Sequence, residues 1–202
     1  AGSGRVPAGV NNIVGLKPTK GWFSTAGVVP ACRTLDCVSI FALTVADAAL
    51  VAEVAGGFDE RDPYSRAMPA GASLPWPTAP RIAIPATLEF FGDTQAAAVF
   101  DDAVRALQAA GAEVAAIDFA PFNELAALLY QGPWVAERFA AVQALWQESP
   151  EAINPVVRGI VEQAANYSAL DAFKAEYRRA ELTRQIHQTL AGFDALVVPT
   201  SP

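Results

Sequence analysis

The sequence predicts an α/β fold whose β-sheet is at least partly parallel. A strand pattern at 81–85, a helical pattern at 95–110 and a second strand pattern at 112–117 follow one another directly. Such a strand–helix–strand unit places two parallel strands side by side. The composition supports an ordered core, because 52% of the 202 residues are hydrophobic and only 17% are charged, whereas disordered chains combine low hydrophobicity with high charge density.

The first 80 residues contain one clear helical pattern. Residues 1–40 are rich in Gly, Pro, Ser and Thr between short apolar runs, which indicates loops and short strands. Thr44 and Asp47 form a capping-box pattern before a helix that we expect at 45–55. Residues 57–80 contain so many prolines that we expect a long surface loop there.

The remaining residues alternate strand and helix patterns and then become mostly helical. Asp93 and Thr94 can cap the helix at 95–110, and its inward positions are expected to be Val99, Phe100, Ala103, Val104 and Leu107. Ser168 and Asp171 form a second capping-box pattern. The other expected elements are helices at 123–129, 133–147, 155–165 and 168–190 and a final strand at 194–199.

Composition excludes several classes of function. A net charge of −7 argues against a nucleic-acid partner, because phosphate binding needs a basic surface. The chain has no uncharged apolar run of the roughly 18 residues that a membrane-spanning helix needs. One histidine and two cysteines, Cys32 and Cys37, do not supply the four ligands of a structural zinc site, so no metal site is expected. Two cysteines also favour a reducing compartment.

The two ends of the sequence resemble cuts inside a longer protein. The chain opens Ala-Gly-Ser-Gly-Arg-Val-Pro and closes Val-Val-Pro-Thr-Ser-Pro directly after an apolar run. We therefore expect residues 1–202 to form a single domain that is part of a larger polypeptide.

Ser3 is the first candidate for chemistry. Gly2 and Gly4 flank it, and glycines allow a tight turn whose N–H groups converge beside a nucleophile. The alternative is an ordinary Gly-Ser loop. His187 is the only possible imidazole base for a Ser-His-acid triad, but its place on a long amphipathic helix favours an ordinary surface position.

Tyr130 and Arg138 flank the expected helix junction at Gly132 and Pro133. An arginine can bind a carboxylate through two parallel hydrogen bonds. The alternative is an exposed helix arginine paired with the neighbouring Glu137, a contact worth under about 1 kcal/mol. The residues alone favour that alternative.

Several motifs in order resemble the amidase signature family. They are the nucleophile motif at Ala1–Ala8, the Gly-Leu-Lys-Pro-Thr motif at Gly15–Thr19, Asp36, and the Thr-Val-Ala-Asp-Ala motif at Thr44–Ala48. Within this family, the stretches Asn11–Thr19, Val28–Ser39 and Leu129–Arg138 are similar to the allophanate hydrolase subfamily. The resemblance covers nearly the whole chain and implies a mixed β-sheet flanked by helices, of which this chain would be the C-terminal portion.

The resemblance implies amide hydrolysis by a Ser–cis-Ser–Lys triad. Ser3 matches the nucleophile, and the backbone N–H groups of Ala1, Gly2 and Ser3 would form the oxyanion hole. Tyr130 and Arg138 would contact the substrate allophanate, which is cleaved to ammonia and carbon dioxide without a cofactor. The family's lysine and second serine both precede the nucleophile, so we expect this chain to be inactive alone. Lys17 is expected to be structural.

The same resemblance leaves other functions open. The enzyme could instead be a broad-specificity amidase or a glutamine-hydrolysing amidotransferase subunit, or the chain could be a noncatalytic fragment or interaction module. Full-length allophanate hydrolases are typically cytoplasmic and dimeric, so we expect the larger protein to be a cytoplasmic homodimer that contacts neither nucleic acid nor membrane.

Overall fold

The computed structural model describes residues 2–68 and 75–200. Their contacts divide the chain into two compact units, with the boundary in the sequence at about residue 75. The first unit consists of helices and a small ribbon, and the second contains a parallel sheet and a series of helices. Across these described ranges, no helix combines the length and apolar character needed to cross a bilayer. A single domain over 1–202 stays a prediction.

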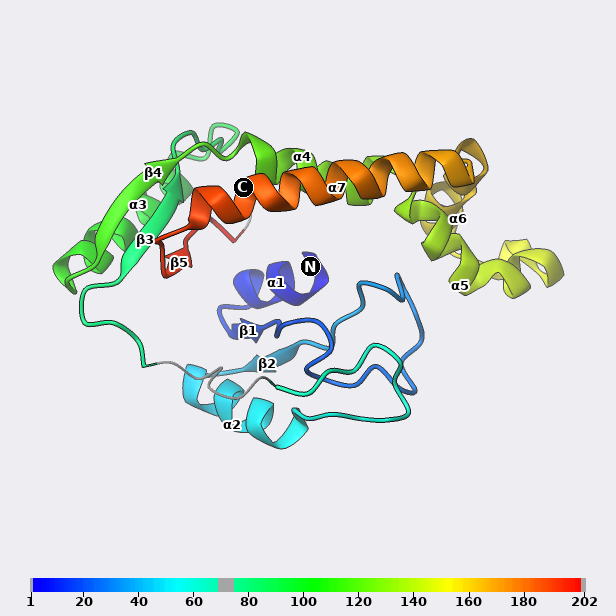
Figure 1. Cartoon of the computed structure of the whole chain (residues 1–202), viewed down its shortest axis with the longest axis horizontal. Helices are drawn as coiled ribbons and strands as arrows, with labels where there is room; N and C mark the ends of the chain where they lie inside the picture. Colours follow the sequence, from blue (N-terminus) through cyan, green and yellow to red (C-terminus); the bar gives the residue numbers. More distant parts are fainter. Residues whose placement is uncertain (1, 69–74, 201–202) are drawn as a thin grey trace. The chain divides into compact units, whose positions relative to one another are not determined.

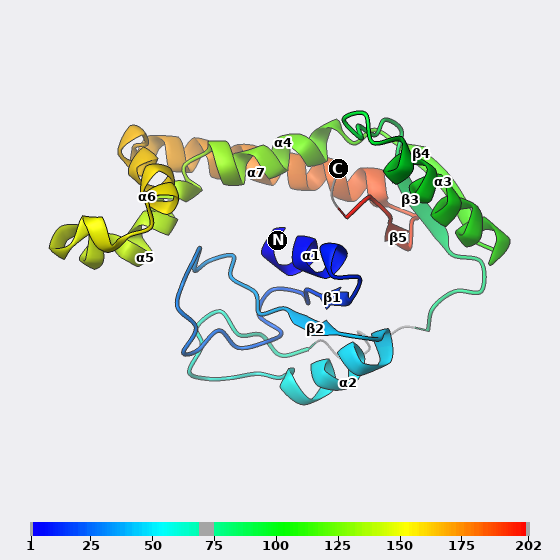
Figure 2. The same cartoon turned by 180° about the vertical axis from the view of Figure 1, so that it is seen from behind.

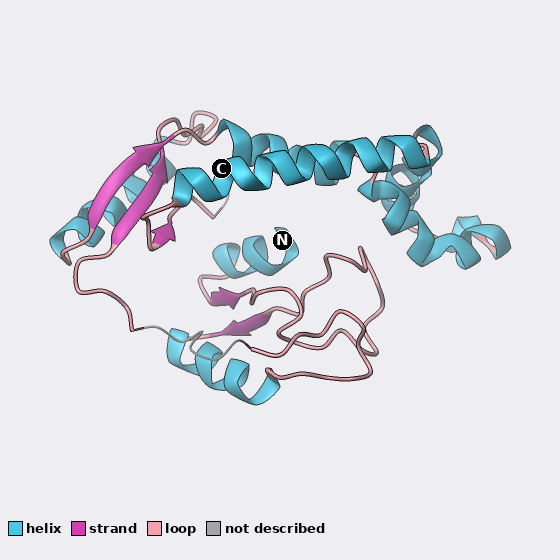
Figure 3. Ribbon diagram, in the orientation of Figure 1, coloured by secondary structure: helices cyan, strands magenta, loops and turns pink. Residues whose placement is uncertain are grey.

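The first unit is a two-stranded ribbon between two helices. Strands β1 (Val14–Leu16) and β2 (Ile40–Ala42) pair antiparallel, with Gly15 opposite Phe41. Helix α1 (Gly2–Val10) lies on one side of the ribbon and α2 (Val45–Ala55) on the other (Figure 1). Long connections without regular structure complete the unit (Figure 3).

The core of the first unit lies between the ribbon and α2. Thr44 caps α2 by accepting a hydrogen bond from the Asp47 N–H, as the capping pattern predicts. This start directs Ala48 and Ala52 inward, where both are buried. The buried cluster contains Phe23, Ile40, Ala48 and Ala52, and half-buried side chains of Val14, Leu16, Trp22 and Ala42 pack against it.

The helix α1 corrects the expectation of loops and short strands at the start of the chain. Its glycines and Pro7 have low helix propensity. Tertiary contacts override this propensity, because Gly15 of β1 approaches α1 so closely that a Cβ there would lie 2.7 Å from the Gly4 carbonyl oxygen. Ala8 of α1 is buried. The helix therefore depends on packing that sequence periodicity does not reveal.

The second unit contains the parallel sheet that the strand–helix–strand pattern predicts. Strand β3 (Arg81–Pro85) is central, with β4 (Glu113–Ile117) and β5 (Ala195–Leu196) parallel to it on either side. Helix α3 (Thr94–Ala109) connects β3 to β4, and Asp93 caps it. The α/β class is confirmed, although in the described residues the antiparallel pair and the parallel strands belong to separate sheets.

A helical arm lies between β4 and β5 along the chain of the second unit. Its longest helix, α7 (Ala169–Leu190), lies side by side with α4 (Ala120–Gln131) in both views (Figures 1 and 2). The Ser168–Asp171 capping box forms as predicted. Between α4 and α7 the chain forms α5 (Trp134–Glu148), η1 (Pro150–Ala152), α6 (Pro155–Val161) and η2 (Glu162–Asn166).

Several expected elements differ in detail. The helix expected at 155–165 changes to 3₁₀ geometry after Val161, and only 195–196 of the final strand pairs in the sheet. On α3, Phe100 is buried as expected, but Val99 is 60% exposed and Ala103 is also exposed. The described parts of 57–80 form the expected loop, while residues 69–74 lie outside the described residues.

Candidate functional site

Ser3 lies in the first turn of α1 and is exposed. The N–H groups of the first helical turn have no carbonyl partner within the helix, and the helix macrodipole places partial positive charge there. Such a position favours an oxyanion beside the serine. Gly2 and Ser3 of the predicted oxyanion hole are in this turn, whereas Ala1 lies outside the described residues.

Ser39 packs against the same turn of α1. A Cβ on Gly4 would lie 2.5 Å from the Ser39 Oγ and 3.3 Å from its Cβ. No ordinary Cβ contact is as short as the first distance. The absence of a side chain at Gly4 therefore allows the turn that carries Ser3 to lie directly against the chain entering β2.

Lys17 follows β1 and contacts a neighbouring loop. Its Nζ donates to the Pro18 carbonyl oxygen at 2.5 Å and lies 3.8 Å from the Cys37 Sγ. The Cys37 thiol in turn donates to the Pro18 oxygen at 3.2 Å. These contacts tie the chain after β1 to the chain before β2, and they suit a structural lysine.

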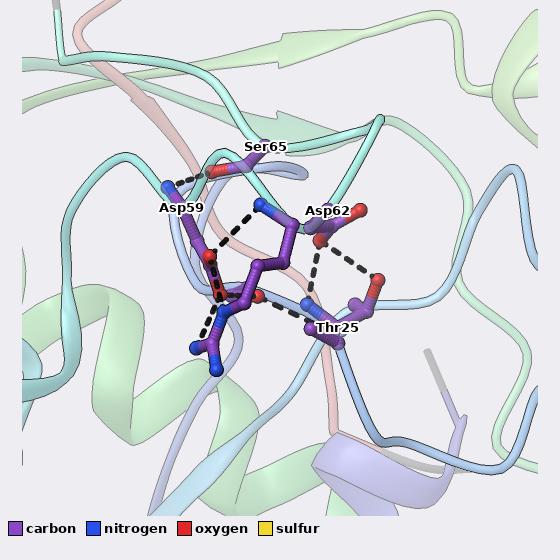
Figure 4. A network of polar contacts seen from close by, with 7 residues as sticks. Thr25, Asp59, Asp62 and Ser65 are labelled. Atoms are coloured by element: carbon purple, nitrogen blue, oxygen red, sulfur yellow. Dashed lines mark hydrogen bonds and ion pairs between the residues drawn. The ribbon is translucent and has the colours of Figure 1, made fainter.

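A carboxylate network that the sequence did not identify joins two loops of the first unit (Figure 4). Asp62 is only 5% exposed. Its carboxylate accepts hydrogen bonds from the Thr25 N–H at 2.6 Å, the Thr25 hydroxyl at 2.9 Å and the Tyr64 N–H at 2.9 Å. Nearby, Asp59 binds Arg61 and the Ser24 hydroxyl.

These hydrogen bonds favour the charged form of both acids. The Arg61 side chain, followed by the Ser24 hydroxyl, lowers the pKa of Asp59 well below its usual value. Backbone N–H groups of Thr25 and Tyr64 lower the pKa of Asp62 and outweigh the opposing effect of burial. Neither group is suited to be a general base near neutral pH, because each is stabilised as an anion by contacts within the chain.

The same loops line a pocket of about 200 Å³. Its two carboxylates, Asp36 and Asp62, already accept backbone hydrogen bonds, Asp36 from the N–H groups of Ala31 and Cys32 at 3.0 Å each. Both acids therefore act as loop anchors, which is a structural role. The sequence signal was the Asp-x-x-Asp-Pro run at 59–63, which looks like an ordinary polar loop.

The second unit brings Tyr130 and Arg138 together. Tyr130 is near the end of α4, and Arg138 is in α5. The Arg138 Cζ lies 5.3 Å from the centre of the Tyr130 ring, a cation–π contact. Among the ion pairs given for the described residues, none involves Arg138. The Arg138 side chain is half-buried.

The other candidates take ordinary positions. His187 is exposed in the last turn of α7, as the helix pattern predicts. Cys32 is buried and Cys37 is half-buried. Where the structure describes the chain, no three His, Cys, Asp or Glu side chains gather in a way that could hold a metal ion.

The chain is similar to known amide-cleaving proteins along its whole length. The family model described as Amidase matches residues 1–202. A urea amidolyase of Saccharomyces cerevisiae is 45% identical over 205 residues, which cover 100% of this chain and 11% of that protein. The chain therefore spans about a tenth of the length of this curated relative.

Solved structures share the fold. The K. lactis urea amidolyase matches with a TM-score of 0.95 at 44% identity, covering 99% of this chain and 12% of that chain. A variant of the Kluyveromyces lactis allophanate hydrolase, in which one serine is replaced by alanine, matches with a TM-score of 0.93 at 43% identity. That match covers 97% of this chain and 32% of the hydrolase chain.

Proposed function

Because the chain belongs to the amidase family, we propose that it carries the serine nucleophile of an enzyme that hydrolyses allophanate. The observation that carries this proposal is the exposed Ser3 at the N-terminal turn of α1, within the family's nucleophile motif. The similarity to an allophanate hydrolase at 43% identity supports the choice of substrate.

The reaction follows from the position of Ser3. Its Oγ attacks the terminal amide carbonyl of allophanate, and the developing oxyanion accepts hydrogen bonds from backbone N–H groups, which by the resemblance are those of Ala1, Gly2 and Ser3. The C–N bond then breaks, and ammonia leaves with a proton from the conjugate acid of the base. Water hydrolyses the remaining acyl-serine, and decomposition of the product releases carbon dioxide.

The base is proposed to lie outside this chain. In the family a lysine acts through a cis-serine, and both precede the nucleophile. The Nζ of Lys17 already donates a hydrogen bond to the Pro18 carbonyl oxygen. The match to only 32% of the allophanate hydrolase chain is consistent with a longer protein that supplies these two groups. We call that longer polypeptide the full-length protein.

Arg138 and Tyr130 are proposed to recognise the substrate. Allophanate carries a carboxylate, and a guanidinium can bind a carboxylate through two N–H groups. Tyr130 is 59% exposed, and Arg138 lies over its ring. The exposed part of the ring is proposed to contact the planar ureido group of the substrate.

Ser3→Ala in the full-length protein tests the nucleophile. We expect ammonia release from allophanate to fall by at least about a thousandfold, because the covalent step is lost. A serine-reactive probe should label wild type at Ser3 and leave the variant unlabelled. The 202-residue chain alone should release no ammonia. Normal turnover by Ser3→Ala would refute the assignment, and absence of labelling in an active protein would favour a noncatalytic role for this region.

Arg138→Ala tests the substrate. A charged hydrogen bond contributes about 1.5–3 kcal/mol, so KM for allophanate should rise roughly ten- to a hundredfold. A neutral amide should be cleaved as before. Arg184→Ala, at an exposed position of α7, is the matched control. Equal losses on both substrates would indicate a broad-specificity amidase.

By the same resemblance, we propose a cytoplasmic homodimer for the full-length protein. Sedimentation of the purified protein and fractionation of cells would check the two parts of this proposal.

A further inference from the structure

The junction between α4 and α5 sets the geometry of the Tyr130–Arg138 pair. Only Gly132 and Pro133 separate the two helices. A change in the angle between the helices would therefore move the guanidinium relative to the ring, now 5.3 Å from it. The contacts that fix the junction also fix the pair.

Gly132 makes the junction tight. Its backbone is extended, and a Cβ at this position would collide with the Leu128 carbonyl oxygen in the last turn of α4. Gly132 is buried, and so is Val135 in the first turn of α5. The chain thus leaves α4 and enters α5 with little room for a different path.

Tyr167 holds the same junction from a distant part of the sequence. Its hydroxyl donates to the Gln131 carbonyl oxygen at 2.8 Å. Gln131 is the last residue of α4, where carbonyl groups have no partner within the helix. Tyr167 itself is half-buried, and its N–H bonds to the Ala164 carbonyl oxygen at 3.2 Å. The capping box that begins at Ser168 fixes the backbone on its other side.

A second tie holds α4 at its opposite end. The Arg178 guanidinium of α7 binds both oxygens of Glu124, at 2.6 and 2.7 Å. This contact lowers the pKa of the Glu124 carboxyl and raises that of Arg178. Helix α4 is therefore attached to α7 near its start and to Tyr167 at the end that carries Tyr130.

We propose that Tyr167 is a positioning residue for substrate recognition. Resting on the proposed function, this inference assigns to its hydroxyl the task of keeping Tyr130 and Arg138 in the geometry that receives the allophanate carboxylate. Tyr167 acts through Gln131 and Gly132 and does not itself touch the substrate.

Tyr167→Phe in the full-length protein tests the assignment. It removes one hydroxyl and keeps the ring. Loss of a neutral hydrogen bond should raise KM for allophanate about three- to tenfold, with kcat within about twofold of wild type. Cleavage of a neutral amide should be unchanged. Tyr177→Phe is the matched control, because Tyr177 lies on α7, outside the junction, and is 65% exposed.

A double-mutant comparison separates positioning from general stability. In an Arg138→Ala background, Tyr167→Phe should have no further effect on KM, since the group that it positions is gone. An additional rise there, or equal losses on the neutral amide, would overturn the positioning role. If Arg138→Ala alone leaves KM for allophanate unchanged, the proposed function fails. If Arg138→Ala raises KM but Tyr167→Phe does not, only the role of Tyr167 fails.

Discussion

Gly4 and Ser39 show how one missing side chain determines where Ser3, the proposed nucleophile, can lie. The turn carrying Ser3 contacts the chain before β2 only because Gly4 has no Cβ. The family motif at Ala1–Ala8 identifies Ser3 in the sequence. It does not reveal this packing, because Ser39 is 35 positions away from Gly4 in the chain, and only the fold brings them together.

Gly4→Ala is expected to displace the turn of Ser3. The new Cβ would meet the Ser39 Oγ at 2.5 Å, and overpacking of this kind costs about 1–3 kcal/mol. Activity of the full-length protein should fall together with its melting temperature. Adding Ser39→Ala should restore part of both, because it removes the closest atom and leaves the Cβ at 3.3 Å. Full activity in Gly4→Ala alone would contradict the packing argument.

At the scale of elements, capping residues made boundaries predictable. Thr44 and Ser168 start α2 and α7 where their patterns predict, because each cap is a local interaction over three residues. Helix α1 and the Tyr167–Gln131 contact were not predictable in this way. Both depend on residues far apart in the sequence, and Gly4 and Pro7 even argue locally against a helix.

Ser168→Ala should weaken the start of α7. Loss of an N-cap hydroxyl typically costs about 0.5–2 kcal/mol. Hydrogen exchange of the first turn of α7 in the full-length protein should become faster, while exchange in α2 stays as in wild type. Thr189→Ala, near the other end of α7, serves as the comparison because its hydroxyl donates within the helix, to the Gln185 carbonyl oxygen. If hydrogen exchange of the first turn of α7 is unchanged in Ser168→Ala, packing alone stabilises the start of this helix.

The loop network around Asp62 should make the first unit sensitive to acid. The folded-state pKa of Asp62 is below its ordinary value of 3.8. A carboxyl with a depressed pKa stabilises the fold fully above the unfolded-state pKa, and this stabilisation disappears as pH falls through the folded-state value. In Asp62→Asn, hydrogen exchange of the Thr25 amide should therefore be faster than in wild type near neutral pH. In strong acid, the exchange rates of the variant and wild type should become equal. Asp101→Asn, at an exposed position of α3, should match wild type throughout.

For the whole molecule, the outer face of α2 indicates that more protein is needed to cover it. Leu50 is 62% exposed and Val54 82%, and their i, i+4 spacing places both on one face of the helix. Exposed apolar side chains grouped on one helix mark an interaction surface. The similarity to much longer urea amidolyases fits this view, because the chain spans only about a tenth of their length.

The isolated 202-residue chain should bind a hydrophobic dye that the full-length protein does not. Replacing Leu50 and Val54 by Gln in the isolated chain should reduce the dye fluorescence, since the two side chains are 62% and 82% exposed. Equal fluorescence from the isolated chain and the full-length protein would show that no further segment covers this face.

The pairing of β3 with β5 has a consequence for the order in which the second unit is built. The Arg81 N–H donates to Asp194 across 113 positions, and the Arg81 guanidinium binds the Gly192 carbonyl oxygen and lies over the Phe193 ring. Closing a loop of that length costs about 4 kcal/mol of chain entropy. On the ribosome, β3 and β4 can associate early through their local crossover, whereas the third strand must wait until the intervening helices have emerged.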